Sequence, residues 1–136
     1  MRIAEALGKD PAYFIEEKEL KDVSFIALED RQTEPLEKVD GVFETLTNSI
    51  PSGKINARLI TLAPSKNRKM EVHSHNCDEA ALVLKGSVKY QVDDRVYELG
   101  EGDSICYRAS QKHGYVNTSK EQEAKMIWFA TERGVD

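Results

Sequence analysis

The stretch that decides the fold runs from residue 73 to residue 117 and reads HSHNCDEAALVLKGSVKYQVDDRVYELGEGDSICYRASQKHGYVN. Short runs rich in Val, Leu, Ile and Tyr alternate in it with turn residues, as at Asp93–Asp94. Such runs predict strands, and short turns between them predict antiparallel pairing. Residues 87–92 and 95–99, joined by the two aspartates, are expected to form a tight hairpin.

The same pattern extends outward on both sides of this stretch. Strand-like runs occupy the segments 23–28, 41–46, 55–62, 69–75, 79–86, 87–92, 95–99, 104–109, 112–117 and 124–130. Many short strands with short turns indicate an all-β sandwich or barrel rather than an α/β fold. Because 136 residues is the length of one ordinary domain, we expect a single domain over 23–136.

Residues 1–22 follow a different pattern. Apolar residues recur at helix-like spacing over 2–7 and again over 11–18. Asp10 followed by Pro11 suits the N-cap and the first position of the second of these helices. The sequence therefore predicts a short N-terminal helical segment before the β-rich domain.

Composition and charge exclude several classes of protein. The net charge of −5 argues against a strongly basic surface that would bind nucleic acid. No apolar run approaches the roughly 18 residues of a membrane span, and the first residues lack a secretory signal. We therefore expect a cytoplasmic protein without membrane contact, in which Cys77 and Cys106 are reduced.

Three histidines are the only imidazoles in the chain, and their spacing is informative. His73 and His75 are two residues apart in a strand-like run, which predicts that both point to one face. Glu79 follows four residues later, and His113 lies in a separate run. An imidazole pair with a carboxylate is a reasonable donor set for a divalent transition metal ion.

The two segments together resemble the paired motifs of the cupin superfamily. The first motif places two histidines and a glutamate before a turn glycine, which here are His73, His75, Glu79 and Gly86. The second opens with a glycine and continues to a histidine and an asparagine, which here are Gly102, His113 and Asn117. The resemblance implies a small double-stranded β-helix, the cupin jelly-roll barrel, over about 23–131. It also implies a metal held by His73, His75, Glu79 and His113.

The sequence departs from these motifs at three positions. Asn67 stands where the first motif usually has glycine, and Arg108 and Ser110 replace a proline and a glycine of the second. These positions shape turns and are not ligands, so the metal prediction is unaffected. Four protein ligands leave two positions open on an ion that accepts six, and Fe, Mn, Ni, Co and Zn all fit. The alternative is a metal-free cupin whose histidines are hydrogen-bonded pocket groups.

Further side chains are candidates for a ligand pocket beside the metal. They are Tyr115, Asn117, Arg58, Tyr90, Arg108 and Trp128, with Tyr107 and Met126 as weaker ones. Tyr115 and Asn117 share strand parity with His113. Ordinary barrel packing is the alternative for each of these residues.

The opening RIAEALGKDPAYFIEE, residues 2–17, resembles the last helix and exit segment of XRE-family (Cro/repressor-like) helix-turn-helix domains. The resemblance implies the small-molecule-sensing domain of a bacterial transcriptional regulator, with DNA contacted only through a helix-turn-helix domain absent from this chain. An ordinary amphipathic helix packed on the barrel is the alternative for this segment.

Two functions follow from these resemblances. One is a sensor that binds a small-molecule effector. The other is a metal-dependent cupin enzyme of the dioxygenase, isomerase or decarboxylase type, acting on a small-molecule substrate. A homodimer is expected in either case, because the run 79–84 is apolar at successive positions and both its faces are expected to be covered.

Overall fold

The computed structural model describes residues 22–51, 53–64 and 70–131. Short strands dominate these ranges. They are β1 (Thr33–Pro35), β2 (Gly41–Thr45), β3 (Ile55–Leu62), β4 (Asp78–Lys85), β5 (Val88–Val92), β6 (Arg95–Leu99), β7 (Ser104–Arg108), β8 (His113–Asn117) and β9 (Ala124–Thr131). The only helix in the described ranges is a 3₁₀ turn, η2 (Leu28–Asp30). The all-β prediction is therefore confirmed.

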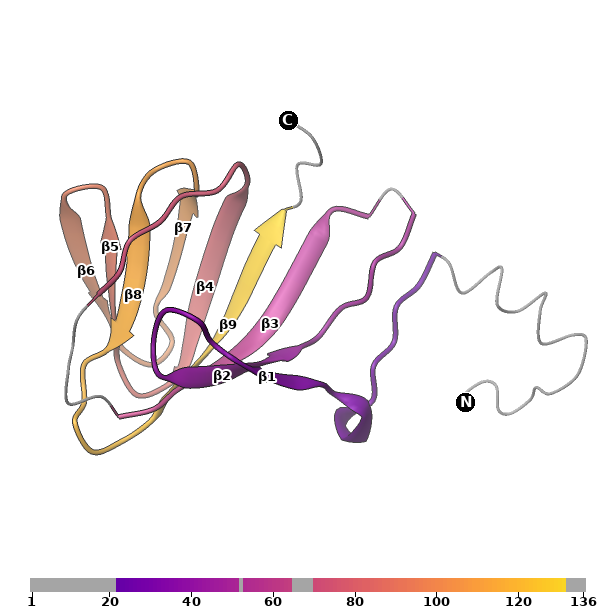
Figure 1. The fold of residues 1–136 in the computed structure, drawn as a ribbon, viewed down its shortest axis with the longest axis horizontal. Coiled ribbons are helices and arrows are strands. Elements are labelled where there is room, and N and C mark those ends of the chain that lie inside the picture. The colour runs from indigo at the N-terminus through magenta and orange to yellow at the C-terminus, as the bar shows by residue number, and fades with distance from the viewer. Residues whose placement is uncertain (1–21, 52, 65–69, 132–136) are drawn as a thin grey trace, which may run out of the picture.

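The strands form two antiparallel sheets that face each other (Figure 1). The larger sheet has the order β1-β2-β3-β9-β4-β7, and the smaller has the order β6-β5-β8. In the larger sheet β1, β2 and β3 follow one another, whereas β9, from the end of the chain, lies between β3 and β4. This arrangement is the double-sheet jelly roll expected from the sequence.

Alternation along the strands builds the core between the sheets. β5 alternates buried and half-buried side chains, and the central strands β3, β4 and β9 also alternate over most of their length. One face of each strand therefore points inward. The fully buried side chains include Ile60, Leu62, Val83, Val88, Tyr90 and Met126. The predicted hairpin is confirmed as β5–β6, with Asp93 at the turn in the left-handed region (φ 53°).

The predicted strand over 23–28 is wrong. Residues 23–27 have no regular structure, and η2 follows them. Phe25 is 78% exposed, and no described strand pairs with this segment. A β-branched and aromatic run needs a neighbouring strand to form a ladder, which this one lacks. The sequence patterns also missed β1, whose Thr-Glu-Pro sequence is a poor strand signal.

The predicted strand over 69–75 is also wrong for its described residues, 70–75. They make only an isolated antiparallel bridge, His73 with His113. The backbone opposite them turns at 109–111, immediately before β8 begins. Pairing is therefore limited to a few hydrogen bonds and does not extend into a ladder.

The predicted helices over 2–7 and 11–18 lie outside the described residues. The division into 1–22 and 23–136 therefore stays a prediction. In the part of the chain that the structure describes, no helix has the length and apolarity needed to cross a lipid bilayer.

Candidate metal centre

The segment before β4 carries two of the three histidines to the open end of the barrel. The backbone N–H of His73 donates to the carbonyl of His113 at 2.9 Å, and the N–H of His113 donates back to the carbonyl of His73 at 2.8 Å. The N–H of His75 donates to the carbonyl of Ala109 at 2.8 Å. These bonds hold the segment against β8 and the turn before it.

His113, the first residue of β8, is completely buried. Its Nδ1 lies 2.8 Å from the backbone carbonyl of Gln111. A carbonyl can only accept, so Nδ1 carries the proton in this contact. The lone pair of a neutral His113 is therefore on Nε2, the nitrogen that faces the other histidines and Glu79.

The three histidines come together although two of them precede β4 and the third begins β8. One ring nitrogen from each of His73, His75 and His113 lies within 4.8 Å of the others. The rings of His73 and His113 have centroids 4.6 Å apart. Such a triad of imidazoles is a common donor set for zinc, copper, iron or nickel.

Two buried ring nitrogens in this cluster are unsatisfied. Nδ1 of His73 and Nε2 of His113 make no hydrogen bond with the described residues. Oε1 of Glu79 lies 3.2 Å from Nε2 of His113, but a neutral His113 with its proton on Nδ1 directs a lone pair at this oxygen and donates nothing to it. A buried polar atom without a partner costs about 1–3 kcal/mol, so each such atom requires an explanation. Coordination of a cation by these nitrogens would remove this cost, and the residues present therefore fit a metal ion.

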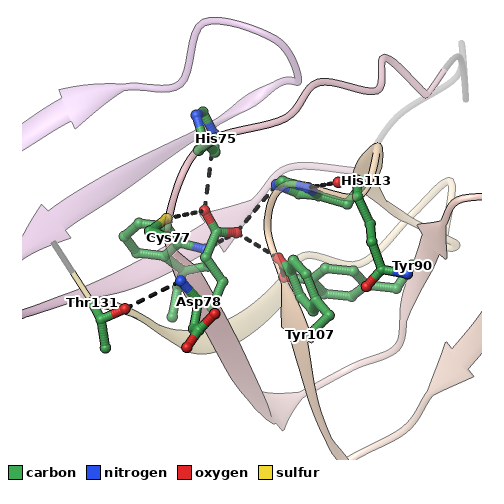
Figure 2. Close-up of polar contacts among 10 residues, drawn as sticks. His75, Cys77, Asp78, Tyr90, Tyr107, His113 and Thr131 are labelled. Atoms are coloured by element: carbon green, nitrogen blue, oxygen red, sulfur yellow. Dashed lines mark hydrogen bonds and ion pairs between the residues drawn. The ribbon is translucent and has the colours of Figure 1, made fainter. Parts of the chain in front are cut away.

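Glu79, the second residue of β4, lies beside the triad and is 3% exposed. Its Oε1 lies 3.2 Å from Nε2 of His113, and its Oε2 lies 3.9 Å from Nε2 of His75. The hydroxyl of Tyr107 donates to Oε1 at 2.6 Å, and Nε1 of Trp128 donates to the same atom at 3.3 Å. Figure 2 shows His75, Tyr107 and His113 converging on this carboxylate. Two donors thus fix its orientation.

Electrostatics keep the carboxylate ionised despite its burial. Burial alone would raise the pKa of Glu79, but the contacts from His113 and Tyr107 outweigh it and hold the pKa below its usual range. Burial acts in the opposite direction on His113, whose pKa is nevertheless raised by Glu79 and by the Gln111 carbonyl. The pKa of His73 is lowered by burial and by its two histidine neighbours. A neutral His73 and an ionised Glu79 are the forms that bind metal.

A cavity of about 700 Å³ opens beside the cluster. Its walls include His73, His75 and Glu79, so a molecule in the cavity would be adjacent to the candidate metal centre. This volume is typical of small-molecule sites.

The structure brings three of the six main sequence-predicted pocket residues to this cavity, and neither Tyr107 nor Met126 lines it. Arg58, Tyr115 and Trp128 line it. Tyr90 is fully buried in the core, where its hydroxyl is 3.4 Å from that of Tyr107. Arg108 is exposed and does not line the cavity; its Nε lies 4.0 Å from Oδ1 of Asp78.

Asn117 does not line the cavity either. Its side-chain nitrogen donates to the backbone carbonyls of Leu62, Ala63 and Gln122, and its Oδ1 accepts from the N–H of Ser119. Asn117 therefore joins the end of β3 to the loop that follows β8. Phe43 and residues 34–39, which also line the cavity, were not predicted from the sequence. The alternation within 41–46 could have indicated Phe43.

Fold and site together define a double-sheet barrel with a histidine-rich candidate metal centre at the mouth of a cavity. The family model described as a cupin domain matches residues 58–130, more than half of the chain. The chain therefore belongs to the cupin family, as its motifs indicated. Comparison with curated protein sequences finds no match.

Solved structures share the fold. A RmlC-like cupin from Shewanella frigidimarina NCIMB 400 is 20% identical, with a TM-score of 0.66 over 82% of this chain and 93% of that chain. The Fe(II) form of HppE is 19% identical, with a TM-score of 0.69 over 80% of this chain and 61% of that chain. An HTH_3 family transcriptional regulator from Vibrio cholerae is 20% identical, with a TM-score of 0.60 over 90% of this chain and 64% of that chain. This chain thus spans less than two thirds of the last two.

Proposed function

We propose that this chain is a metal-binding cupin domain that senses a small molecule for a bacterial transcriptional regulator. The observation that carries the proposal is the meeting of three imidazoles, with two unsatisfied buried nitrogens, at the wall of a cavity. Metal binding satisfies those nitrogens, and the cavity gives an effector access to the same place.

His73, His75, Glu79 and His113 are the proposed ligands. The two donors to Glu79 and the Gln111 carbonyl at Nδ1 of His113 orient these side chains before any ion arrives. A divalent metal ion, when bound, supplies a Lewis acid at the cavity wall. Its identity among Fe, Mn, Ni, Co and Zn depends on supply as well as on the donor set.

Two observations favour a sensor. Residues 2–17 resemble the end of an XRE-family helix-turn-helix domain. The Vibrio cholerae protein, a transcriptional regulator, matches 90% of this chain, more than the other two compared structures do. A sensor works when its effector binds one arrangement of the regulator better than another. The cavity of a sensor therefore has to bind the effector but not to convert it. A cytoplasmic location accords with this proposal.

A metal-dependent enzyme is the second candidate. It is favoured by the likeness to the Fe(II) form of HppE and by the open side of the ligand set toward the cavity. Tyr115 lines that cavity, and burial raises the pKa of its hydroxyl to about 12, which keeps it a proton donor at neutral pH. A dioxygenase, isomerase or decarboxylase would use such a site.

The two candidates differ in what happens to a bound molecule. We would load the protein with metal, identify small molecules that raise its melting temperature, and incubate each in excess with the protein. A sensor returns the compound intact in mass spectrometry, whereas an enzyme converts more than one equivalent. Turnover that His75→Ala abolishes would overturn the sensor proposal.

The gene provides an independent check. The sensor proposal expects that the coding sequence around this chain encodes the remaining helices of a helix-turn-helix domain. A coding sequence in which residues 2–17 are not part of such a domain would remove its main support.

A further inference from the structure

Arg58 is a cation on the inward face of the barrel. It lies opposite Trp128 in the β3–β9 ladder, two residues from the buried Ile60. Its guanidinium carbon is 4.1 Å from the centroid of the Phe43 ring and 5.2 Å from that of Trp128. Two aromatic rings thus hold the charge by cation–π attraction at the wall of the cavity.

The hydrogen-bonding capacity of Arg58 is not used within the described residues. A guanidinium has five N–H donors, yet the side chain of Arg58 makes no hydrogen bond and no ion pair with any residue that the structure describes; its aromatic contacts are those with Phe43 and Trp128. Arg31, by contrast, pairs with Glu44 at 3.4 Å. The rings compensate part of the desolvation of the Arg58 charge, but they accept none of its N–H groups.

These free donors face the cavity that also contains the histidines. Arg58, Tyr115, His75 and Glu79 all line it. The cavity wall therefore contains a guanidinium from Arg58 and a phenol hydroxyl from Tyr115.

We propose that the cavity binds its small molecule through a carboxylate group held by Arg58. A planar guanidinium matches a carboxylate with two parallel hydrogen bonds. Lys38 also lines the cavity, but the acidic side chains of Glu34, Glu37, Glu71 and Glu79 outnumber the two cations. Their repulsion acts twice as strongly on a doubly charged phosphate as on a singly charged carboxylate. The inference rests on the proposed small-molecule site and deepens it, but it does not depend on the metal.

The test compares ligands that differ only in the anionic group. Benzoate, benzamide and phenyl phosphate would be titrated into the protein by ligand-observed NMR, with and without metal. The fluorescence of Trp128, the only tryptophan in the chain, would locate the site. We expect benzoate to bind at least about tenfold more tightly than benzamide, the effect of one charge-assisted hydrogen-bonded pair. Phenyl phosphate is expected to bind more weakly than benzoate.

Variants assign the effect to Arg58. Arg58→Gln is expected to weaken benzoate binding by about tenfold and to leave benzamide binding and metal content unchanged. Arg58→Lys keeps the charge but loses the planar pair of donors, so its affinity for benzoate should lie between those of the wild type and Arg58→Gln. This variant also serves as the test if Arg58→Gln does not fold. Arg95→Gln, at an exposed arginine of β6, is the matched control and should bind like the wild type.

Several results would overturn the inference. They are equal affinities for benzoate and benzamide, no detectable benzoate binding, an unchanged affinity in both Arg58 variants, or a clear preference for phenyl phosphate. Failure of the metal proposal is distinguishable, since it would appear as absence of metal while benzoate still binds through Arg58.

Discussion

At the scale of single residues, the carboxylate of Glu79 depends on its neighbours for its orientation. The 2.6 Å hydrogen bond from Tyr107 is its shortest contact. Tyr107→Phe removes only the hydroxyl, so Glu79 gains freedom to rotate away from the histidines. We expect about tenfold weaker metal binding, measured by competition with a chromogenic chelator.

A second tyrosine provides the control for this variant. Tyr97 on β6 is 39% exposed, and its hydroxyl makes no hydrogen bond with the described residues, so Tyr97→Phe should bind metal like the wild type. Equal metal affinities in the two variants would mean that Glu79 needs no support from Tyr107, or that Glu79 is not a ligand.

Asn117 is predicted to stabilise the folded state. Its side chain is 3% exposed, and its nitrogen donates hydrogen bonds to three backbone carbonyls, of which that of Gln122 is closest at 2.8 Å. Asn117→Ala leaves these buried groups without their donor, and we expect a loss of about 2 kcal/mol in the free energy of unfolding by urea denaturation. Asn48→Ala, at an exposed position, is the control. A loss no larger than that of the control would contradict this reading of Asn117.

These residues show where sequence reasoning succeeds and where it stops. The proximity of His73, His75, Glu79 and His113 could be predicted because motif spacing is local and specific, while their binding of a metal stays a proposal. Strand parity with His113 was enough to make Tyr115 a pocket candidate, and Tyr115 lines the cavity. Asn117 could not be interpreted in the same way, because its partners come from segments more than 50 residues away as well as from the next turn.

At the scale of elements, the contact between the His73 segment and β8 determines whether the triad forms. Gly114 allows this close approach, since a Cβ there would lie 2.5 Å from the backbone carbonyl oxygen of Glu71. Gly114→Ala must therefore push the segment away from β8 and separate His73 from His113. We expect about tenfold weaker metal binding although no ligand is changed.

A second glycine provides the control, because it shows whether any Gly→Ala change in this fold weakens metal binding. At Gly100 an added Cβ would meet nothing closer than Asp103 Oδ2 at 3.8 Å, so Gly100→Ala should bind metal like the wild type. Wild-type metal affinity in Gly114→Ala would show that the triad does not depend on this contact.

Most strands could be predicted from alternation and turns. The two strands that were predicted wrongly failed for one physical reason. The runs 23–28 and 69–75 have strand-like composition, but a strand also needs a partner with free backbone groups. The first run has none among the described residues. The second is opposite a turn, which leaves a bridge in place of a ladder. Such non-local pairing cannot be read from composition.

At the scale of the whole molecule, the outer face of the larger sheet is unusually apolar. The outward residues of β4 and β9 include Ala80, Leu82, Leu84, Ile127 and Phe129, with Asp78, Lys125 and Thr131 at the ends of the strands. Phe129 is 40% and Leu84 47% exposed in the single chain. Exposed apolar patches are typical of subunit interfaces, so the homodimer predicted from the sequence, which stays a prediction, is expected to use this face.

Analytical ultracentrifugation tests this assembly. The wild type is expected to sediment as a dimer and Phe129→Glu as a monomer, because a charge in the centre of the patch opposes its burial. Val96→Glu, which changes an exposed aliphatic residue of the smaller sheet, should leave the dimer intact. A monomeric wild type would refute the prediction.

The metal content of untagged protein tests the central claim most directly. Elemental analysis is expected to find about one transition metal ion per chain in the wild type, and none in His75→Ala with its fold verified by circular dichroism. His75 is the accessible member of the triad, so its loss removes a ligand without opening the core. Absence of metal from the wild type, even after reconstitution with each candidate ion, would contradict the account and leave a metal-free ligand-binding cupin.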